Sequence, residues 1–151
     1  MNPRIRLAAL LSALALGGIV AYQYLFDPAA AVKRAVQAAA GAFENRNLDG
    51  FMAAVSRNYA DDQSMTYDGV REAASEAFQA FEAFNVTLEK VEITVDGSTA
   101  RFTALATVVA TTRDREKYMA IGTPESGQRL ELELHKEDGT WRVTSAHGYA
   151  R

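Results

Sequence analysis

Residues 84–97 read FNVTLEKVEITVDG and decide the fold, because the apolar spacing changes here from a helical period to a strand period. Phe84, Val86 and Leu88 alternate with polar residues, as in a strand that buries one face. The apolar set then resumes at Val91, one step out of phase. Such a shift within one strand predicts a β-bulge that bends the sheet.

An antiparallel meander is predicted after this strand. Asp96 and Gly97 form a hairpin turn signal, and residues 99–112 supply the partner strand. The charged run RDREK and the turn sequence GTPESG then interrupt the pattern, before three leucines between residues 130 and 134 alternate with polar residues. In the last strand, alternation places five residues on the concave face: Trp141, Val143, Ser145, His147 and Tyr149.

Three helices are predicted before the sheet. Asp27 and Pro28 can serve as the N-cap and first position of a helix that runs to Asn45. Asn47 can cap a second helix, and Asp68 can cap a third. Apolar residues at helical spacing give each helix one face to bury. Helices followed by antiparallel strands predict an α+β domain with three helices on one side of a curved sheet.

Composition limits the partners and the chemistry. The chain has 151 residues, a net charge of −3 and no cysteine. Its basic residues are scattered, which predicts no nucleic-acid partner. His135 and His147 have neither a carboxylate nor a second histidine at ligand spacing on their own elements. We therefore expect no metal site and no cofactor.

The N-terminal segment predicts a membrane anchor. From Leu7 to Phe26 the chain carries no charge. A helix of this length spans about 30 Å, which is close to the hydrocarbon thickness of a bilayer. We therefore expect residues 1–27 to form a transmembrane helix and residues 28–151 to form one folded domain.

The flanking residues suggest how this anchor is oriented. Arg4 and Arg6 favour a cytoplasmic N-terminus, so we expect a single-pass protein of the inner (cytoplasmic) membrane with its C-terminal domain in the periplasm. The alternative is a protein secreted after signal cleavage, for which Ala29 and Ala31 supply the small residues. Against cleavage, the bulky stretch YQYLFDP occupies the place of the short polar region that precedes a cleavage site.

The order of elements resembles one known family. NLDGFMAAVSRNYADD (residues 47–62) and DGTWRV (residues 138–143) are its most similar stretches. Over roughly residues 31–149 the chain resembles the nuclear transport factor 2-like (SnoaL-like) superfamily. The resemblance implies a cone-shaped, cystatin-like fold with a pocket between the long helix and the concave sheet. Members include isomerases, dehydratases, cyclases, lipid carriers and interaction domains, so the fold alone does not give the function.

Two residues are weak candidates for catalysis. The resemblance to ketosteroid isomerase makes Asp68 the nearest match to its base, but the two oxyanion donors of that enzyme have no counterpart. The first donor is a tyrosine of the first helix, and its equivalent place here falls near Ala39, which has no hydroxyl. The second donor is an acid on a later strand, but residues 99–112 contain no carboxylate. His147 is the other candidate, because SnoaL-like chemistry typically pairs a histidine with an aspartate. The alternatives are that Asp68 caps a helix and that His147 is a polar residue near a strand end.

A hydrophobic ligand pocket is the other prediction for the cone. Its candidate lining residues are Tyr67, Phe78, Phe81, Trp141, His147 and Tyr149. We expect a membrane-tethered, non-catalytic domain that binds a small hydrophobic ligand or a partner protein. The alternative is a small SnoaL-like isomerase, dehydratase or cyclase that uses acid-base residues in the cone.

Dimerisation through the convex face of the sheet stays open. The outward residues of the last two strands are polar, which disfavours a hydrophobic homodimer interface there: Glu131, Glu133, His135, Arg142 and Thr144. By contrast, the strand from Thr103 to Val109 is fairly apolar on both faces.

Overall fold

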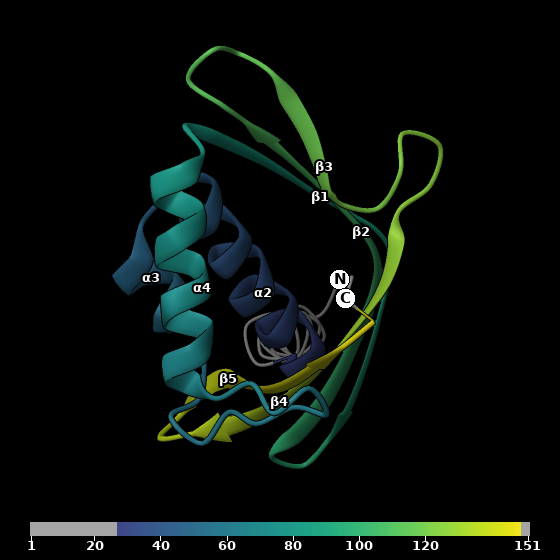
Figure 1. The fold of residues 1–151 in the computed structure, drawn as a ribbon. Coiled ribbons are helices and arrows are strands. Elements are labelled where there is room, and N and C mark those ends of the chain that lie inside the picture. Colours follow the sequence, from purple (N-terminus) through teal and green to yellow (C-terminus); the bar gives the residue numbers. More distant parts are fainter. Residues whose placement is uncertain (1–26, 149–151) are drawn as a thin grey trace, which may run out of the picture.

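A computed structural model describes residues 27–148. Three helices pack against the concave side of a five-stranded antiparallel sheet (Figure 1). The helices are α2 (Pro28–Glu44), α3 (Leu48–Met52) and α4 (Tyr67–Ala80). The strands are β1 (Ala83–Asp96), β2 (Thr99–Thr111), β3 (Lys117–Ile121), β4 (Gln128–Glu137) and β5 (Thr140–His147). This arrangement confirms the predicted α+β domain.

The predicted membrane anchor lies outside the described residues, as does Tyr149. Within residues 27–148, no helix combines the length and the apolar character that are needed to cross a bilayer. The anchor, its orientation and the alternative of signal cleavage therefore stay predictions.

The first two helices begin where the sequence predicts. The Asp27 side chain accepts a hydrogen bond from the Ala29 N–H at 3.0 Å, and Pro28 follows as the first helical residue of α2. Similarly, Asn47 Oδ1 accepts a hydrogen bond from the Gly50 N–H at 3.0 Å at the start of α3. Both contacts satisfy backbone donors that have no partner inside the helix.

The predicted cap of the third helix is wrong. Thr66, not Asp68, caps α4, and its Oγ1 accepts a hydrogen bond from the Gly69 N–H at 3.3 Å. Asp68 lies exposed in the first turn, where the helix dipole favours a negative charge. The earlier start places Tyr67 inside the helix, with its ring buried against Met52 and the segment that follows α3.

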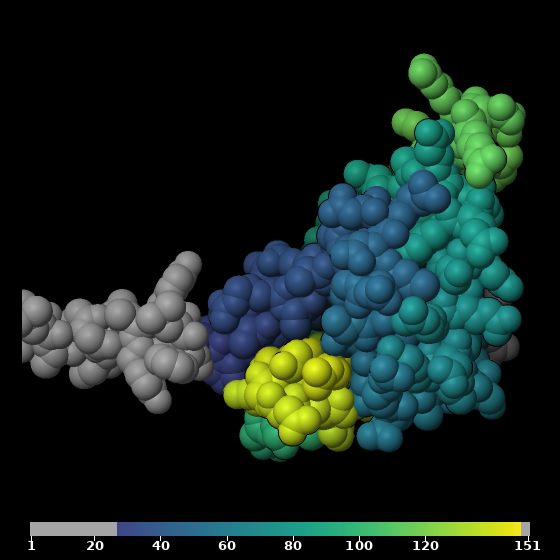
Figure 2. Space-filling view, turned by 90° about the vertical axis from the view of Figure 1, so that its left-hand side faces the viewer, coloured from purple at the N-terminus to yellow at the C-terminus, as the bar shows by residue number. Residues whose placement is uncertain are grey.

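The sheet order is β1-β2-β4-β5, and β3 pairs with the far end of β2. The predicted bulge in β1 is confirmed between Glu89 and Glu92, where Lys90 takes a positive φ of 51°. However, the sequence assigns residues 113–127 to a connection, and the structure forms β3 within it. Figure 2 shows the hairpin that contains β3 projecting beyond the body of the domain.

A second bulge, in β5, reverses one prediction. Leu134 pairs with Val143 and Glu133 pairs with Ser145, so Thr144 is an extra residue in β5. Beyond it, Leu132 pairs with Ala146, which therefore faces the helices. Ser145 and His147 face the opposite side, so the prediction that they share the concave face with Trp141 and Val143 is wrong. Simple alternation fails because a bulge changes the phase of a strand.

The tightest part of the core lies at the N-terminal half of α2. Val32 and Leu134 are 0% and 1% exposed, and they pack with Phe102 and Trp141. This cluster packs α2 against β2, β4 and β5.

Candidate functional site

An apolar cavity of about 440 Å³ lies between the helices and the concave face of the sheet. This volume is in the range of small-molecule pockets in proteins, about 300–1,000 Å³. The helices contribute Val36, Ala39, Ala40, Phe43, Phe51, Val70, Ala73, Ala74 and Ala77. The segment between α3 and α4 contributes Ala54, Val55, Tyr59 and Met65. The sheet contributes Val86, Leu88, Val108, Ile121, Leu130, Leu132, Val143 and Ala146.

Small side chains on the helices leave this space empty. Alanine is the commonest lining residue, and a larger side chain at these positions would project into the cavity. The walls beside them are packed by aromatic rings. The Phe43 ring lies 5.3 Å from Phe51, 5.0 Å from Phe78 and 4.8 Å from Phe84, measured between centroids. These contacts hold α2 and α3 against α4 and β1.

Among the described residues, Tyr59 is the one lining residue whose side chain carries a hydroxyl, amide or charged group. Tyr59 is 7% exposed, and its hydroxyl donates a hydrogen bond to Asp61 Oδ2 at 2.9 Å. The Tyr59 ring packs in the core after α3, in a cluster with Met52 and Val55. The cavity can therefore hold an apolar molecule and can meet at most a small polar group at one place on its wall.

The structure places the predicted pocket residues elsewhere in the domain. Tyr67, Phe78 and Trp141 are buried in three different core clusters. Phe81 packs at the edge of the Phe78 cluster, with its ring 6.1 Å from the ring of Tyr118. None of these side chains lines the cavity.

The two acid-base candidates are also outside the cavity. Asp68 is exposed in the first turn of α4, and His147 lies on the outer face of the sheet. His147 contacts Asp62 and Ser145 rather than Asp68. The structure therefore does not bring Asp68 and His147 together around one reacting atom.

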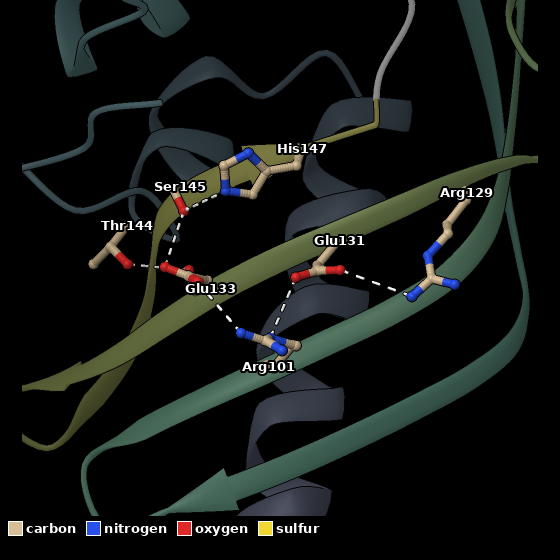
Figure 3. A network of polar contacts seen from close by, with 7 residues as sticks. All are labelled: Arg101, Arg129, Glu131, Glu133, Thr144, Ser145 and His147. Atoms are coloured by element: carbon tan, nitrogen blue, oxygen red, sulfur yellow. Dashed lines mark hydrogen bonds and ion pairs between the residues drawn. The ribbon is translucent and has the colours of Figure 1, made fainter. Parts of the chain in front are cut away.

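His147 belongs instead to a polar network on the outer face (Figure 3). Arg101 Nε lies 3.2 Å from Glu131 Oε1, and an Arg101 amino group lies 3.8 Å from Glu133 Oε1. The Ser145 hydroxyl donates to Glu133 Oε2 at 3.3 Å and lies 3.4 Å from His147 Nε2. These contacts connect β2, β4 and β5 on the side of the sheet that faces away from the helices.

The sequence does not distinguish the alanines that line the cavity from alanines that are packed in the core. Ala39 and Ala40 lie in an alanine-rich helix whose buried stripe is marked by Val32 and Val36. The sequence gives the face of the helix correctly. It does not show that part of this face borders a cavity.

Solved structures of the same fold have low sequence identity to this chain. A provisionally assigned aromatic ring hydroxylase from Novosphingobium aromaticivorans is 18% identical with a TM-score of 0.65, over 77% of this chain and 83% of that one. A provisionally assigned scytalone dehydratase from the same organism is 11% identical with a TM-score of 0.66, over 77% and 78%. An NTF2-like protein of unknown function from Pseudomonas putida is 13% identical with a TM-score of 0.65, over 83% and 87%. At these identities the similarity concerns the fold alone.

The family is identified by sequence. No curated protein matches the chain in a direct comparison. However, the family model of the SnoaL-like domain matches residues 32–148, which is most of the chain and nearly all of the described part. The match agrees with the cone of three helices on a bent sheet that surrounds the apolar cavity. The chain therefore belongs to the SnoaL-like family of nuclear transport factor 2-like domains.

Proposed function

We propose that this domain binds an uncharged, hydrophobic small molecule in the apolar cavity and acts as a binding module rather than as a catalyst. The observation that carries the proposal is the lining, which consists of apolar side chains and a single tyrosine. Burial of apolar ligand surface in such a site contributes roughly 25 cal/mol for each Å² removed from water.

The same lining argues against a charged ligand group inside the cavity. A buried ion without a partner costs several kcal/mol or changes its protonation state. No lysine, arginine, histidine or carboxylate of the described residues lines the cavity. A carboxylate or ammonium group of a ligand would therefore have to remain at the mouth, in contact with water.

A second candidate function rests on Tyr59. Tyr59 lines the cavity and its hydroxyl donates to Asp61, so the pair could transfer a proton to or from a bound molecule. This would make the domain a small acid-base enzyme, and one similar structure is provisionally assigned as a dehydratase. One hydroxyl without a second polar group on the wall supports binding better than it supports catalysis.

The predicted anchor fits the binding proposal. A cavity tethered by residues 7–26 would stay close to a bilayer, where hydrophobic molecules concentrate. In this proposal the domain works at the periplasmic surface of the inner membrane. A protein partner is the alternative occupant, and it would contact the domain from outside the cavity.

Photolabelling of the full chain in its membrane tests the proposal. An uncharged alkyl diazirine that enters the cavity should label the tryptic peptide of residues 72–90, which carries lining residues of α4 and β1. Ala40→Leu should narrow the cavity and lower this labelling severalfold. Ala38→Leu, on the exposed side of the same helix, should leave the labelling unchanged.

Equal labelling of this peptide in Ala40→Leu and Ala38→Leu would contradict the proposal. The fluorescence of Trp141, the one tryptophan of the chain, checks that both variants unfold at similar denaturant concentrations. Tyr59→Phe separates the two candidate functions. A binding module should yield the same bound molecules from this variant as from the native chain, whereas an enzyme should yield molecules that differ in mass or in chromatographic retention.

A further inference from the structure

Strand β3 has one open edge. It pairs with β2 on one side, and within residues 27–148 no strand pairs with its other side. The hairpin that contains β3 projects beyond the body of the domain, and residues 117–120 are all exposed (Figure 2). Tyr118 and Met119 are 49% and 37% exposed, which makes them the most exposed large apolar side chains of the described domain. A strand edge of this kind is typical of a site that pairs with another strand.

The two other outer edges of the sheet are bound by segments of the same chain. On β1, the Val86 N–H donates a hydrogen bond to Glu44 Oε1 of α2 at 2.7 Å. On β5, the Val143 N–H donates to the Ala54 carbonyl at 2.8 Å, and the Val143 carbonyl accepts from the Ser56 N–H at 2.9 Å. The edge of β3 therefore differs from the edges of β1 and β5, because the described part of the chain supplies no such cover for it.

The register shows which backbone groups point to the open edge. The Thr112 N–H, just after β2, donates to the Glu116 carbonyl at 2.9 Å. Backbone groups alternate in direction along a strand, so those of Tyr118, two residues after Glu116, also point to β2. The N–H and C=O groups of Lys117 and Met119 consequently point away from β2, to the open edge.

A second copy of β3 fits these groups. In an antiparallel pair about a two-fold axis through Tyr118, Lys117 of each copy lies opposite Met119 of the other copy. Their outward N–H and C=O groups then bond to one another, and the two Tyr118 residues face each other with Cα atoms about 4.5 Å apart. Because lysine lies opposite methionine, this register places no like charges against each other.

The charges that flank β3 also favour a second copy. Antiparallel pairing brings the turn before β3 of one copy beside the turn after β3 of the other. The first turn carries Arg113 and Arg115, the second carries Glu125, and all three residues are exposed. Opposite charges therefore lie on the same side of the paired strands.

A bilayer is a poorer partner for this edge. Helix α2 begins at Pro28, directly after the predicted anchor. The hairpin that contains β3 projects away from this start of α2 (Figure 2). An anchored domain would therefore hold Tyr118 and Met119 away from the membrane surface.

We propose that two copies of this chain pair through the open edges of β3, antiparallel about a two-fold axis at Tyr118. The two sheets then form one continuous sheet, and Tyr118 and Met119 are covered by the partner copy. This dimer does not use the outer face of the sheet, and it does not depend on a bound ligand.

Cysteine crosslinking of the full chain in its membrane tests the pairing, because the native chain has no cysteine. A Cα separation of about 4.5 Å is within the range that a disulfide spans, roughly 4.4–6.8 Å. Mild oxidation of Tyr118→Cys should therefore give a disulfide-linked dimer of the 16.4 kDa chain. Thr87→Cys is the control, because Thr87 is exposed on the outer face of β1 and should stay uncrosslinked.

Two charge variants at Met119 test the register. In the Tyr118→Cys background, Met119→Glu places a carboxylate opposite Lys117 of the other copy, whereas Met119→Lys places a second ammonium there. The first should speed disulfide formation and the second should slow it, each by about two- to five-fold. The difference between them should shrink in 1 M salt, as expected for exposed charges, since the screening length is then only about 3 Å.

Three results would overturn the proposal. The first is an absence of disulfide dimer from Tyr118→Cys, or as much dimer from Thr87→Cys. The second is an equal rate of disulfide formation in Met119→Glu and Met119→Lys. The third is a disulfide between Tyr118→Cys and a different protein, which would assign the open edge to another partner.

Discussion

Ala146 faces the apolar cavity, whereas its neighbour His147 faces the outer surface of the sheet, because Thr144 is an extra residue in β5. This one-residue bulge keeps the imidazole out of the cavity. The methyl group of Ala146 takes the inward position instead. The bulge also serves the turn that precedes α4, since the Thr144 carbonyl accepts a hydrogen bond from the Ala60 N–H at 3.1 Å.

Leucine at each of these two positions should have opposite effects on the cavity. Ala146→Leu adds volume inside the cavity and should lower labelling of residues 72–90 by the alkyl diazirine. His147→Leu adds none there and should not lower the labelling. The measurement is quantitative mass spectrometry of that peptide from both full-length variants. A loss of labelling in His147→Leu alone would show that the assigned faces of β5 are wrong.

The cap of α4 predicts a difference between two nearby substitutions. Thr66→Ala removes the hydrogen bond to the Gly69 N–H and should lower the free energy of unfolding by about 1 kcal/mol. Asp68→Ala removes only an exposed charge near the helix dipole and should cost about half as much or less. Urea unfolding followed by Trp141 fluorescence measures both. A larger loss from Asp68→Ala would support Asp68 as the cap.

Two glycines with positive φ should differ in their tolerance of a side chain. Gly148 and Gly139 have φ values of 84° and 79°, so alanine at either position costs about 1–2 kcal/mol of backbone strain. At Gly139 an added Cβ meets open space, but at Gly148 it would overlap the Arg129 carbonyl oxygen. Gly148→Ala should therefore lower the free energy of unfolding more than Gly139→Ala does. Equal losses of unfolding free energy in urea would show that β4 can move away from the added Cβ at position 148 without a cost in free energy.

Tyr118, the exposed tyrosine of β3, should lose its proton at a higher pH than an ordinary tyrosine. The Tyr118 hydroxyl donates to Glu116 Oε2 at 2.7 Å, and this hydrogen bond raises the pKa of Tyr118 above its ordinary value of about 10. The bond favours the neutral phenol, so its contribution to stability is present below the ordinary pKa and is lost as the pH rises through the raised one. Glu116→Gln should lower the pKa of Tyr118. The measurement is the ultraviolet difference titration against Tyr118→Phe, and an unchanged titration would contradict the contact.

The bulges show where sequence reasoning succeeds. In β1 the inward residues on both sides of the bulge are large and apolar, so Leu88 and Val91 reveal the change of phase. In β5 the inward residue after the bulge is Ala146, which is too small to mark a face. Ser145 and His147 continue the alternation that begins at Trp141, so the sequence favours a regular strand.

The cavity and the contact between Asp62 and His147 depend on contacts that no local pattern contains. Phe78 and Trp141 pack in core clusters, whereas the aromatic residues Phe43 and Phe51 line the cavity, and the spacing of these residues in the sequence does not distinguish the two cases. The cavity forms where alanines of α2 and α4 face each other across the space above the sheet. Likewise, Asp62 meets His147 only because the chain folds back through the whole sheet.

Native mass spectrometry of the full chain, released from micelles in the gas phase, tests the central claim most directly. We predict that the native chain and Ala38→Leu each carry a non-covalent adduct of a few hundred daltons, and that Ala40→Leu carries none. A bare mass for all three chains would contradict the claim that the cavity binds a small hydrophobic molecule. An adduct that survives equally in Ala40→Leu would place the bound molecule outside the cavity.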